Sequence, residues 1–388
     1  MKIDKVSIIP VTVPLHTPIR HAFSTRTAGL FVIIKIGTDE GLEGIGGGSV
    51  LYPGYIMDSQ ETVMSKIAYL AKNVLLGQDP LKVEQVLAKC DDALRENSVT
   101  KTHVDYALYD LKGKILNVPV YELLGGIARD EIPLEWILTL DEPEAQAKAA
   151  VKFLQAGFHS LKLKVGADRA MAVKRFRTVR EAVGDNIEIG VDMDGMYRAH
   201  DALRLIKELA KYNLHFAEQV VSKHDIDGYL AIKKRTDVPL VADESAWSII
   251  ETFKLIKQRA VDIFHCAPDR IGGFRKSLQF RALVEAADLD YAISTYNSTA
   301  ISHAAATHFA ITCTKRSEIL DELANVLYFT GGIDSKVIEK PSITKEINAT
   351  IENGFVQVPK GPGLGIEIND DLVRQYQTPG VDLITLHQ

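Results

Sequence analysis

Short β-rich runs alternate with amphipathic helical segments from about residue 133 onward, and this alternation limits the fold more than any other feature. Such alternation is typical of βαβ units, which build parallel sheets. The expected strands are Leu134 to Leu140, Ser160 to Lys164, Ile187 to Asp192, His215 to Glu218, Leu240 to Asp243, Val261 to Cys266, Tyr291 to Thr295 and Ile319 to Leu323. Eight strands of this kind predict a closed α/β barrel.

The amino-terminal part has a different pattern. Residues 3 to 14 and 30 to 37 alternate like strands, and residues 37 to 41 are typical of a hairpin turn. Apolar residues then recur at helical spacing in three segments, at 60 to 72, 80 to 94 and 99 to 116. We therefore expect an α+β region before the barrel, and we expect the turn-rich tail to return to it.

The second barrel run ends in Lys162-Leu163-Lys164, and the next three runs end in Asp192, Glu218 and Asp243. Side chains alternate along a strand, so both lysines project to one side. Two crowded, buried ammonium groups disfavour each other's charge, and one lysine is therefore expected to act as a neutral base. The three carboxylates have the oxygen ligands that suit Mg²⁺. Carboxyl ends of barrel strands form the catalytic face, so base and Lewis acid should meet there.

Each of these signals has a plainer interpretation on its own. An isolated Lys-x-Lys is usually a solvated strand edge, and a single acidic residue after a strand is often a helix N-cap. The coincidence of the lysine pair with three acidic strand ends favours a functional site.

Composition narrows the class of protein. Of the 388 residues, 46% are hydrophobic and 25% charged, as in an ordinary soluble protein, and the net charge of -6 does not favour nucleic acid as a partner. Charges interrupt every apolar stretch before the ~20 residues that span a bilayer, and Met1-Lys2-Ile3-Asp4 does not resemble a signal peptide, so no membrane association and a cytoplasmic location are expected. Cys90, Cys266 and Cys313 lack the spacing of a disulfide framework or zinc site.

These residues resemble the enolase superfamily, and within it the mandelate racemase and muconate lactonizing enzyme group. The resemblance extends over nearly the whole chain. Besides Lys-Leu-Lys, it is carried by Asp192-Met193-Asp194, Glu218-Gln219, Ala242-Asp243-Glu244-Ser245, Ile271-Gly272-Gly273, the stretch from Ala107 to Lys114 ahead of Leu123-Leu124-Gly125-Gly126, and Gly361-Pro362-Gly363-Leu364-Gly365.

The resemblance implies a modified TIM barrel of seven to eight βα units at residues 131–350, beneath an α+β capping domain at 1–130 that the tail, 351–388, completes. It also implies that Asp192, Glu218 and Asp243 bind Mg²⁺, that Lys164 is the base and that Lys162 is its neighbour. Enzymes of this superfamily remove the proton α to a carboxylate while Mg²⁺ stabilises the ene-diolate, so that mechanism is carried over from the family. A homo-oligomer is likewise expected from the family.

Departures from the family pattern bear on the reaction. The second catalyst of the group normally ends the sixth strand, and counting back from Ile271-Gly272-Gly273 puts Ala267 there. A shift of two residues would put Asp269 there instead. The seventh-strand histidine position is Tyr296. Alanine transfers no proton, which favours one-base elimination or cycloisomerisation over racemisation.

Nine side chains are expected to contact a small carboxylate substrate. Two follow the seventh strand and one lies on the eighth, four belong to two capping loops, Leu15 to Gly29 and Gly47 to Tyr55, and two lie beside the metal ligands. They are Tyr296, Asn297, Glu322, Arg20, His21, Tyr52, Tyr55, Asp194 and Glu244. Glu244 is also a rival third ligand, and Asp194 could bind the cation or a substrate group. Asp269 and Arg270 suit substrate contact and a surface salt bridge equally, whereas His265 is expected to be a core histidine.

Three functions therefore remain open. The first is a Mg²⁺-dependent lyase or isomerase, either an acid-sugar dehydratase or a muconate-like cycloisomerase. The second is an epimerase of amino-acid, dipeptide or betaine substrates, in which Tyr296 or Asp269 would replace the missing catalyst. The third is a catalytically silent homologue that binds a carboxylate.

Overall fold

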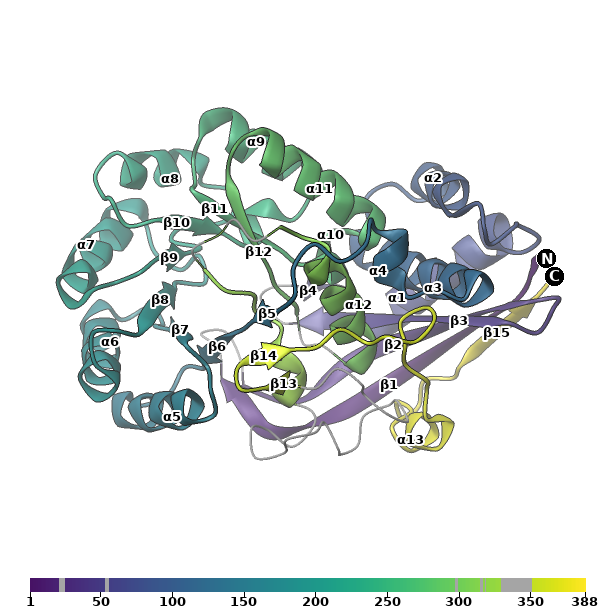
Figure 1. Cartoon of the computed structure of the whole chain (residues 1–388), viewed down its shortest axis with the longest axis horizontal. Coiled ribbons are helices and arrows are strands. Elements are labelled where there is room, and N and C mark those ends of the chain that lie inside the picture. The colour runs from purple at the N-terminus through teal and green to yellow at the C-terminus, as the bar shows by residue number, and fades with distance from the viewer. Residues whose placement is uncertain (21–24, 53–55, 297–298, 315–316, 318, 329–350) are drawn as a thin grey trace.

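The computed structural model of the chain describes residues 1–20, 25–52, 56–296, 299–314, 317, 319–328 and 351–388. Seven parallel strands follow one another in chain order and form the barrel sheet, with helices on its outer side (Figure 1). The strands are β6 (Glu135–Leu138), β7 (Ser160–Lys164), β8 (Glu188–Asp192), β9 (Ala217–Glu218), β10 (Leu240–Ala242), β11 (Ile263–Cys266) and β12 (Asp290–Ile293). The helices between and after them are α5 (Pro143–Gln155), α6 (Arg169–Val183), α7 (Ala199–Leu209), α8 (Ile226–Lys233), α9 (Ile249–Gln258), α10 (Pro268–Ile271), α11 (Phe274–Ala286) and α12 (Ala300–Ile311).

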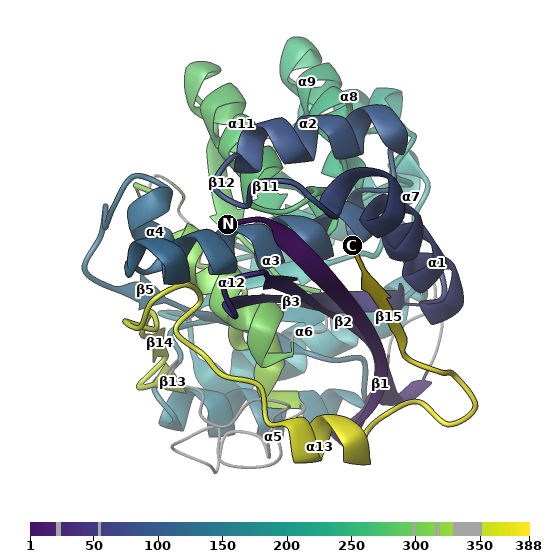
Figure 2. The ribbon, with the colours of Figure 1, turned by 90° about the vertical axis from the view of Figure 1, so that its right-hand side faces the viewer.

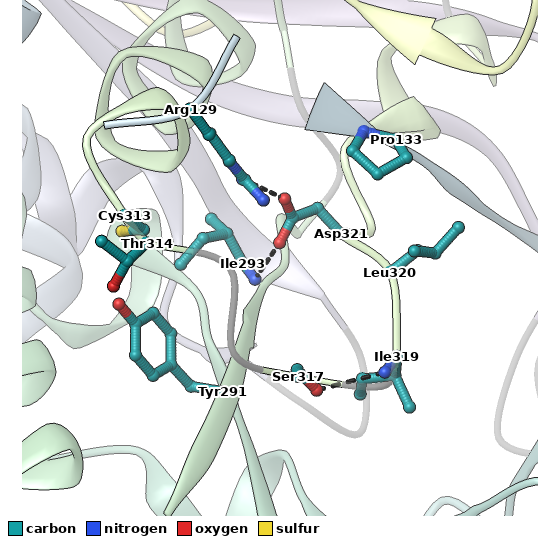
Figure 3. A pocket seen from close by; sticks show the side chains of 10 residues that line it. All are labelled: Arg129, Pro133, Tyr291, Ile293, Cys313, Thr314, Ser317, Ile319, Leu320 and Asp321. Atoms are coloured by element: carbon teal, nitrogen blue, oxygen red, sulfur yellow. Dashed lines mark hydrogen bonds and ion pairs between the residues drawn. The ribbon is translucent and has the colours of Figure 1, made fainter. Parts of the chain in front are cut away.

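The eighth expected strand is reduced to two bridges that close the ring. Asp321 bridges Leu134 on one side, and Glu322 bridges Ser294 on the other. The Asp321 carboxylate accepts a hydrogen bond from the Ile293 amide at 2.7 Å and pairs with Arg129, as Figure 3 shows. A side chain thus supplies a bond that a backbone carbonyl would supply in a regular ladder, which explains why the eighth run forms no continuous strand.

The capping domain is built on an antiparallel sheet that is buried on both faces. It contains β1 (Ile3–Arg20), β2 (Thr25–Thr38), β3 (Glu43–Tyr52) and β4 (Ile56–Met57), with helices α1 (Gln60–Leu70), α2 (Val83–Ala93), α3 (Ser98–Leu116) and α4 (Val120–Leu123) and a π-helical turn at Ala71–Leu75. On β2, Val32 and Ile34 pack in the core with α1 to α3, whereas Phe31 and Ile33 pack in the barrel core. The strand period of two therefore lets one sheet join two cores.

The tail adds one strand to the capping sheet and supplies two strands of a separate small sheet. Strand β15 (Ile384–His387) pairs antiparallel with β1, and Figure 2 shows it beside that strand. Two short strands, β13 (Ile351–Glu352) and β14 (Phe355–Val356), form a separate three-stranded sheet with β5 (Ile132–Pro133), which directly precedes β6, and α13 (Asp370–Gln375) lies between β14 and β15 in the sequence. The expected return of the tail is confirmed. Among the described residues, no helix has the length and apolar character needed to cross a membrane.

Helix α3 ties the capping domain to the barrel through two buried aspartates. Asp105 accepts a hydrogen bond from the Phe274 amide at the start of α11, at 2.6 Å. Asp110 accepts bonds from the Ile45 amide in β3 at 2.8 Å and from the Leu364 amide in the tail at 2.7 Å. Bonds from amides to carboxylates are stronger than neutral ones, so the stretch around Asp110 holds three segments together.

Strand β3 lies very close to α3 because two of its glycines lack a side chain. A Cβ on Gly44 would overlap the carbonyl oxygen of Ala107, and a Cβ on Gly46 would overlap that of His103. We therefore predict that Gly46→Ala lowers the free energy of unfolding by roughly 1–3 kcal/mol, as overpacked cores do. Urea denaturation would measure the change.

Gly37→Ala in β2 is the matched control. A Cβ there would meet its nearest neighbour, Lys5 Cβ, at an ordinary 3.5 Å. Equal losses of stability in the two variants would contradict the packing argument.

Candidate active site

The structure brings four predicted side chains together at the carboxyl edge of the barrel sheet. Lys164, Asp192 and Glu218 are the last residues of β7, β8 and β9, and Asp243 follows the end of β10. The parallel register puts Lys164 opposite Asp192, and Asp192 opposite Glu218. All four side chains are buried. Residues separated by up to 79 positions in the sequence therefore share one site because consecutive strands end at one edge.

The two lysines of β7 are each paired with carboxylates. Lys164 Nζ donates to Asp192 Oδ2 at 2.6 Å and to Asp194 Oδ1. Lys162 Nζ donates to both oxygens of Glu218, at 3.0 and 2.8 Å, and to Glu322. Burial lowers the pKa of Lys162, but Glu218 and Glu322 outweigh burial and raise this pKa well above its ordinary value. Lys162 is therefore held in its charged form by the carboxylates around it, and the role of neutral base stays a prediction for Lys164.

Asp243 is held by two side chains from neighbouring strand ends. The Arg270 guanidinium forms an ion pair with Asp243 Oδ1 at 2.7 Å, and the Tyr296 hydroxyl donates to Asp243 Oδ2 at 3.0 Å. Arg270 itself is only 1% exposed. Asp269 is also buried and accepts a hydrogen bond from the Tyr296 amide at 3.0 Å. A surface salt bridge at Asp269 and Arg270 is therefore excluded.

Glu218, Asp243 and His265 form a buried cluster that could hold a metal ion, because one ligand atom from each lies within 4.8 Å of the others. Burial lowers the pKa of His265, but Glu218 outweighs burial and raises this pKa to about 9. The cluster does not include Asp192, whose Oδ2 pairs with Lys164 and whose Oδ1 accepts the Asp194 amide at 2.8 Å. Burial, with the nearby Asp194 and Glu218, raises the pKa of Asp192 to about 8 despite the opposing effect of Lys164.

Comparison with known proteins identifies the family. Residues 3–125 match the family described as mandelate racemase / muconate lactonizing enzyme, N-terminal domain, and residues 144–372 match the enolase C-terminal domain-like family. The chain belongs to the mandelate racemase and muconate lactonizing enzyme group of the enolase superfamily. It is therefore an enzyme of that superfamily, as the resemblance of its motifs implied.

Two characterised relatives of this group catalyse different reactions. An N-succinyl-L-Arg/Lys racemase from Bacillus cereus is 30% identical over 97% of this chain and 98% of its own length. A chloromuconate cycloisomerase from Cupriavidus necator is also 30% identical, over 97% of this chain and 99% of its own length.

Two solved structures share the whole fold. A mandelate racemase/muconate lactonizing family protein from Azoarcus sp. EbN1 aligns with a TM-score of 0.92 and 32% identity, and both chains are covered completely. A dipeptide epimerase from Cytophaga hutchinsonii, in complex with Mg and the dipeptide D-Ala-L-Val, aligns with a TM-score of 0.88 and 26% identity, again over both complete chains.

The sixth-strand position, where this group normally has its second catalyst, is occupied by Ala267. Ala267 directly follows β11 and is buried in a small cluster with Val99 of α3 and Tyr296, against the partly buried Trp247. Asp269 lies within α10, three residues beyond Cys266, the last residue of β11. Ala267 and not Asp269 directly follows the sixth strand of the barrel sheet, so the assignment of the sixth-strand position to Ala267 stays the prediction that we carry forward.

The remaining predicted contacts fall into three sets. Asp194 and Glu322 pair with Lys164 and Lys162, and Glu244 is buried next to Asp243. Arg20 is an exposed residue at the end of β1 that pairs with Asp141 beyond β6 at 3.4 Å, so this part of the capping domain reaches the barrel mouth. His21, Tyr55 and Asn297 lie outside the described residues, and for Tyr52 only the backbone, in β3, is described.

Both predicted capping loops are largely strands. Strand β1 continues to Arg20, β2 begins at Thr25, and β3 extends to Tyr52. After a register shift between Pro14 and Ile19, the backbones of β1 and β2 pair again as far as Arg20 and Thr25, which explains why a polar, loop-like sequence is extended here.

Two residues at the site were not expected to have structural roles there. Gln219 adopts a positive φ of 40° and accepts hydrogen bonds from the Asp243 and Ser245 amides, at 3.3 and 3.1 Å. It thereby holds the turn that carries Asp243. The sequence pattern indicates a surface or substrate role for Arg270, whereas its position next to the apolar Ile271-Gly272-Gly273 motif is a signal that it could be buried.

Proposed function

We propose that this enzyme removes the proton α to a substrate carboxylate, with Lys164 as the base and Mg²⁺ bound by Asp192, Glu218 and Asp243. Lys164 suits the role because it ends β7 at the barrel mouth, whereas Lys162 is directed into the barrel at Glu218 and Glu322. Lys162 would then fix the Glu218 carboxylate and leave proton transfer to Lys164.

The charges at the site fit a divalent cation. Four buried carboxylates, those of Asp192, Glu218, Asp243 and Glu244, are crowded together, and Glu244 Oε2 has no hydrogen-bond partner among the described residues. Burial and the nearby Asp243 raise the pKa of Glu244 well above its ordinary value, which reflects the repulsion that a cation would relieve.

Asp192 is a better third ligand than His265 for this ion. Mg²⁺ prefers carboxylate and other oxygen ligands, whereas an imidazole nitrogen suits softer metals such as Zn²⁺. Asp192 ends the strand beside Glu218 and has oxygen donors. A cation bound here would compete with Lys164 for the carboxylate of Asp192.

One observation carries the choice of reaction: the side of the barrel opposite Lys164 has the buried, apolar Ala267. The seven strands and the closing pair of bridges form a ring of eight positions. Three of these positions lie between β7 and β11 in each direction, so the two strands face each other across the ring. Ala267 follows β11 and is surrounded by Val99, Tyr296 and Trp247. A site with a single base favours syn elimination or cycloisomerisation.

The steps then need one proton carrier. The Lys164 amine takes the α proton as the C–H bond breaks, and the electron pair moves toward the substrate carboxylate. A bound Mg²⁺ would supply positive charge that offsets the negative charge developing there. In an elimination, Lys164 returns the proton to the leaving hydroxyl on the same face and water departs. In a cycloisomerisation, a substrate carboxylate oxygen would add to the C=C double bond, and protonated Lys164 would give its proton to the α carbon; in the reverse direction Lys164 takes that proton as the ring C–O bond breaks.

The second candidate is an epimerase, and the packing of the Tyr296 side chain against Ala267 is the observation that favours it. Tyr296 or Asp269 would then exchange the proton on the face opposite Lys164. The relative named as an N-succinyl-L-Arg/Lys racemase adds support to this alternative. A silent homologue is the least favoured function, because the lysine and the acidic residues are all present.

Proton NMR in D₂O tests these alternatives. The purified enzyme and Mg²⁺ would be incubated with acid sugars, muconates, dipeptides and N-acyl amino acids, and loss of the α-proton signal would be followed. Elimination or ring closure without epimerisation is the expected result. Deuterium incorporation with inversion at the α carbon would favour the epimerase, and no reaction with any compound would favour the silent homologue.

A further inference from the structure

Arg270 is a fully buried cation that joins three strand ends of the site. It follows β11 in the short helix α10, and its guanidinium reaches Asp243 after β10 and Tyr296 after β12. One terminal nitrogen pairs with Asp243 Oδ1 at 2.7 Å and donates to the Tyr296 hydroxyl at 2.8 Å. The other terminal nitrogen donates to the Asp243 carbonyl oxygen at 3.1 Å.

Two aromatic rings flank the same guanidinium. Its central carbon lies 5.1 Å from the ring centroid of Trp247 and 4.9 Å from that of Tyr296. These distances are within the range of cation–π attraction, which is strongest where water is excluded. The planar fork of arginine is therefore fixed by its rings as well as by its hydrogen bonds.

The Asp243 carboxylate is consequently held at both oxygens. Arg270 forms an ion pair with Oδ1, which accepts no hydrogen bond among the described residues, and the Tyr296 hydroxyl, itself oriented by Arg270, donates to Oδ2. A carboxylate that is contacted at both oxygens cannot rotate freely, so the lone pairs that could bind a cation keep a fixed orientation. Asp243 is also one of the three residues whose ligand atoms cluster within 4.8 Å.

We propose that Arg270, together with Tyr296, is a positioning residue that fixes the Asp243 carboxylate for binding a divalent cation. This inference rests on the proposed function, because it takes Asp243 as a cation ligand. Arg270 would not itself bind the cation, because a guanidinium has only donor nitrogens. The side chain has two opposing effects on cation binding. Its positive charge repels a cation, so removal of that charge alone would tighten binding, whereas loss of its contacts with Asp243 would weaken binding.

Calorimetric titration of the purified, chelator-treated protein with Mn²⁺, supported by electron paramagnetic resonance of free Mn²⁺, separates these effects. Arg270→Met should weaken Mn²⁺ binding by roughly 10- to 100-fold, as loss of residues that orient metal ligands does. Arg270→Lys should recover part of the affinity, because an ammonium keeps the charge but cannot form the fork. Tyr296→Phe should produce a smaller loss, and the double variant should lose less than the product of the two single losses.

Arg180→Met is the matched control. Arg180 is also buried, but its guanidinium donates to backbone carbonyls of Tyr212, Gly184, Ile187 and Asn213, on the outer layer of the barrel. This variant should lose stability and keep its Mn²⁺ affinity. Circular dichroism would confirm the fold of each variant, and Tyr296→Phe and Arg270→Lys would carry the test if Arg270→Met did not fold.

The outcomes separate the two proposals. Wild-type protein that binds Mn²⁺, with unchanged or tighter binding in folded Arg270→Met, would overturn the positioning role and leave the proposed function intact. Wild-type protein that does not bind Mn²⁺ would overturn both.

Discussion

Lys164→Ala should abolish exchange of the substrate α proton while divalent cations still bind. A positioned general base contributes about 10²- to 10⁴-fold to such a step, and Ala267 on the opposite side of the barrel cannot replace it. Lys164 also pairs with Asp192, so its removal frees a proposed ligand, and cation affinity should be equal or higher. The exchange rate in D₂O and the Mn²⁺ affinity of one preparation would be measured together.

Lys174→Ala is the control for this variant. Lys174 lies on α6 outside the barrel, is half exposed, and pairs with Glu144 at 3.5 Å. Exchange in Lys174→Ala should equal that of the wild type. Exchange that persists in folded Lys164→Ala would show that another group is the base and would overturn the proposed mechanism.

Replacing the carboxylates should have the second large effect. Glu218→Gln and Asp243→Asn each keep the side-chain size but remove a negative charge from the buried site, where the compensating positive charge of a cation is poorly screened. We expect Mn²⁺ affinity to fall by at least about 100-fold in each, because a ligand should matter more than the residues that orient it. Calorimetry would give the affinities, and exchange of the α proton should fall with them.

Two further variants decide the third ligand. Asp192→Asn should weaken Mn²⁺ binding strongly, whereas His265→Gln should change it only modestly, because Mn²⁺ favours carboxylate oxygen over imidazole nitrogen. The reverse order would assign the ion to Glu218, Asp243 and His265. Asp91→Asn is the control, since Asp91 pairs with Lys101 and Arg275 in the capping domain interface and should affect stability alone.

The sequence alone determined the order of the elements. The alternation of β-rich and helical runs predicted the barrel, and the structure has seven of the eight expected strands as continuous elements. Periodicity could not predict that the eighth would be two bridges, because the Asp321 side chain takes over a ladder bond only when Ile293 lies beside it in space. Likewise, the predicted capping loops are strands because β1 and β2 pair with each other.

The sequence also determined which chemistry was available. Lys164, Asp192, Glu218 and Asp243 could be proposed together because each ends a predicted parallel strand, and parallel strands end at one edge. Only the tertiary structure decided what each side chain contacts. The charge on Lys162 depends on Glu218 and Glu322, which are 56 and 160 residues away, and the burial of Arg270 depends on Trp247 and Tyr296. Strand period and spacing describe local geometry, whereas electrostatic interactions depend on distances through space, which the fold alone sets.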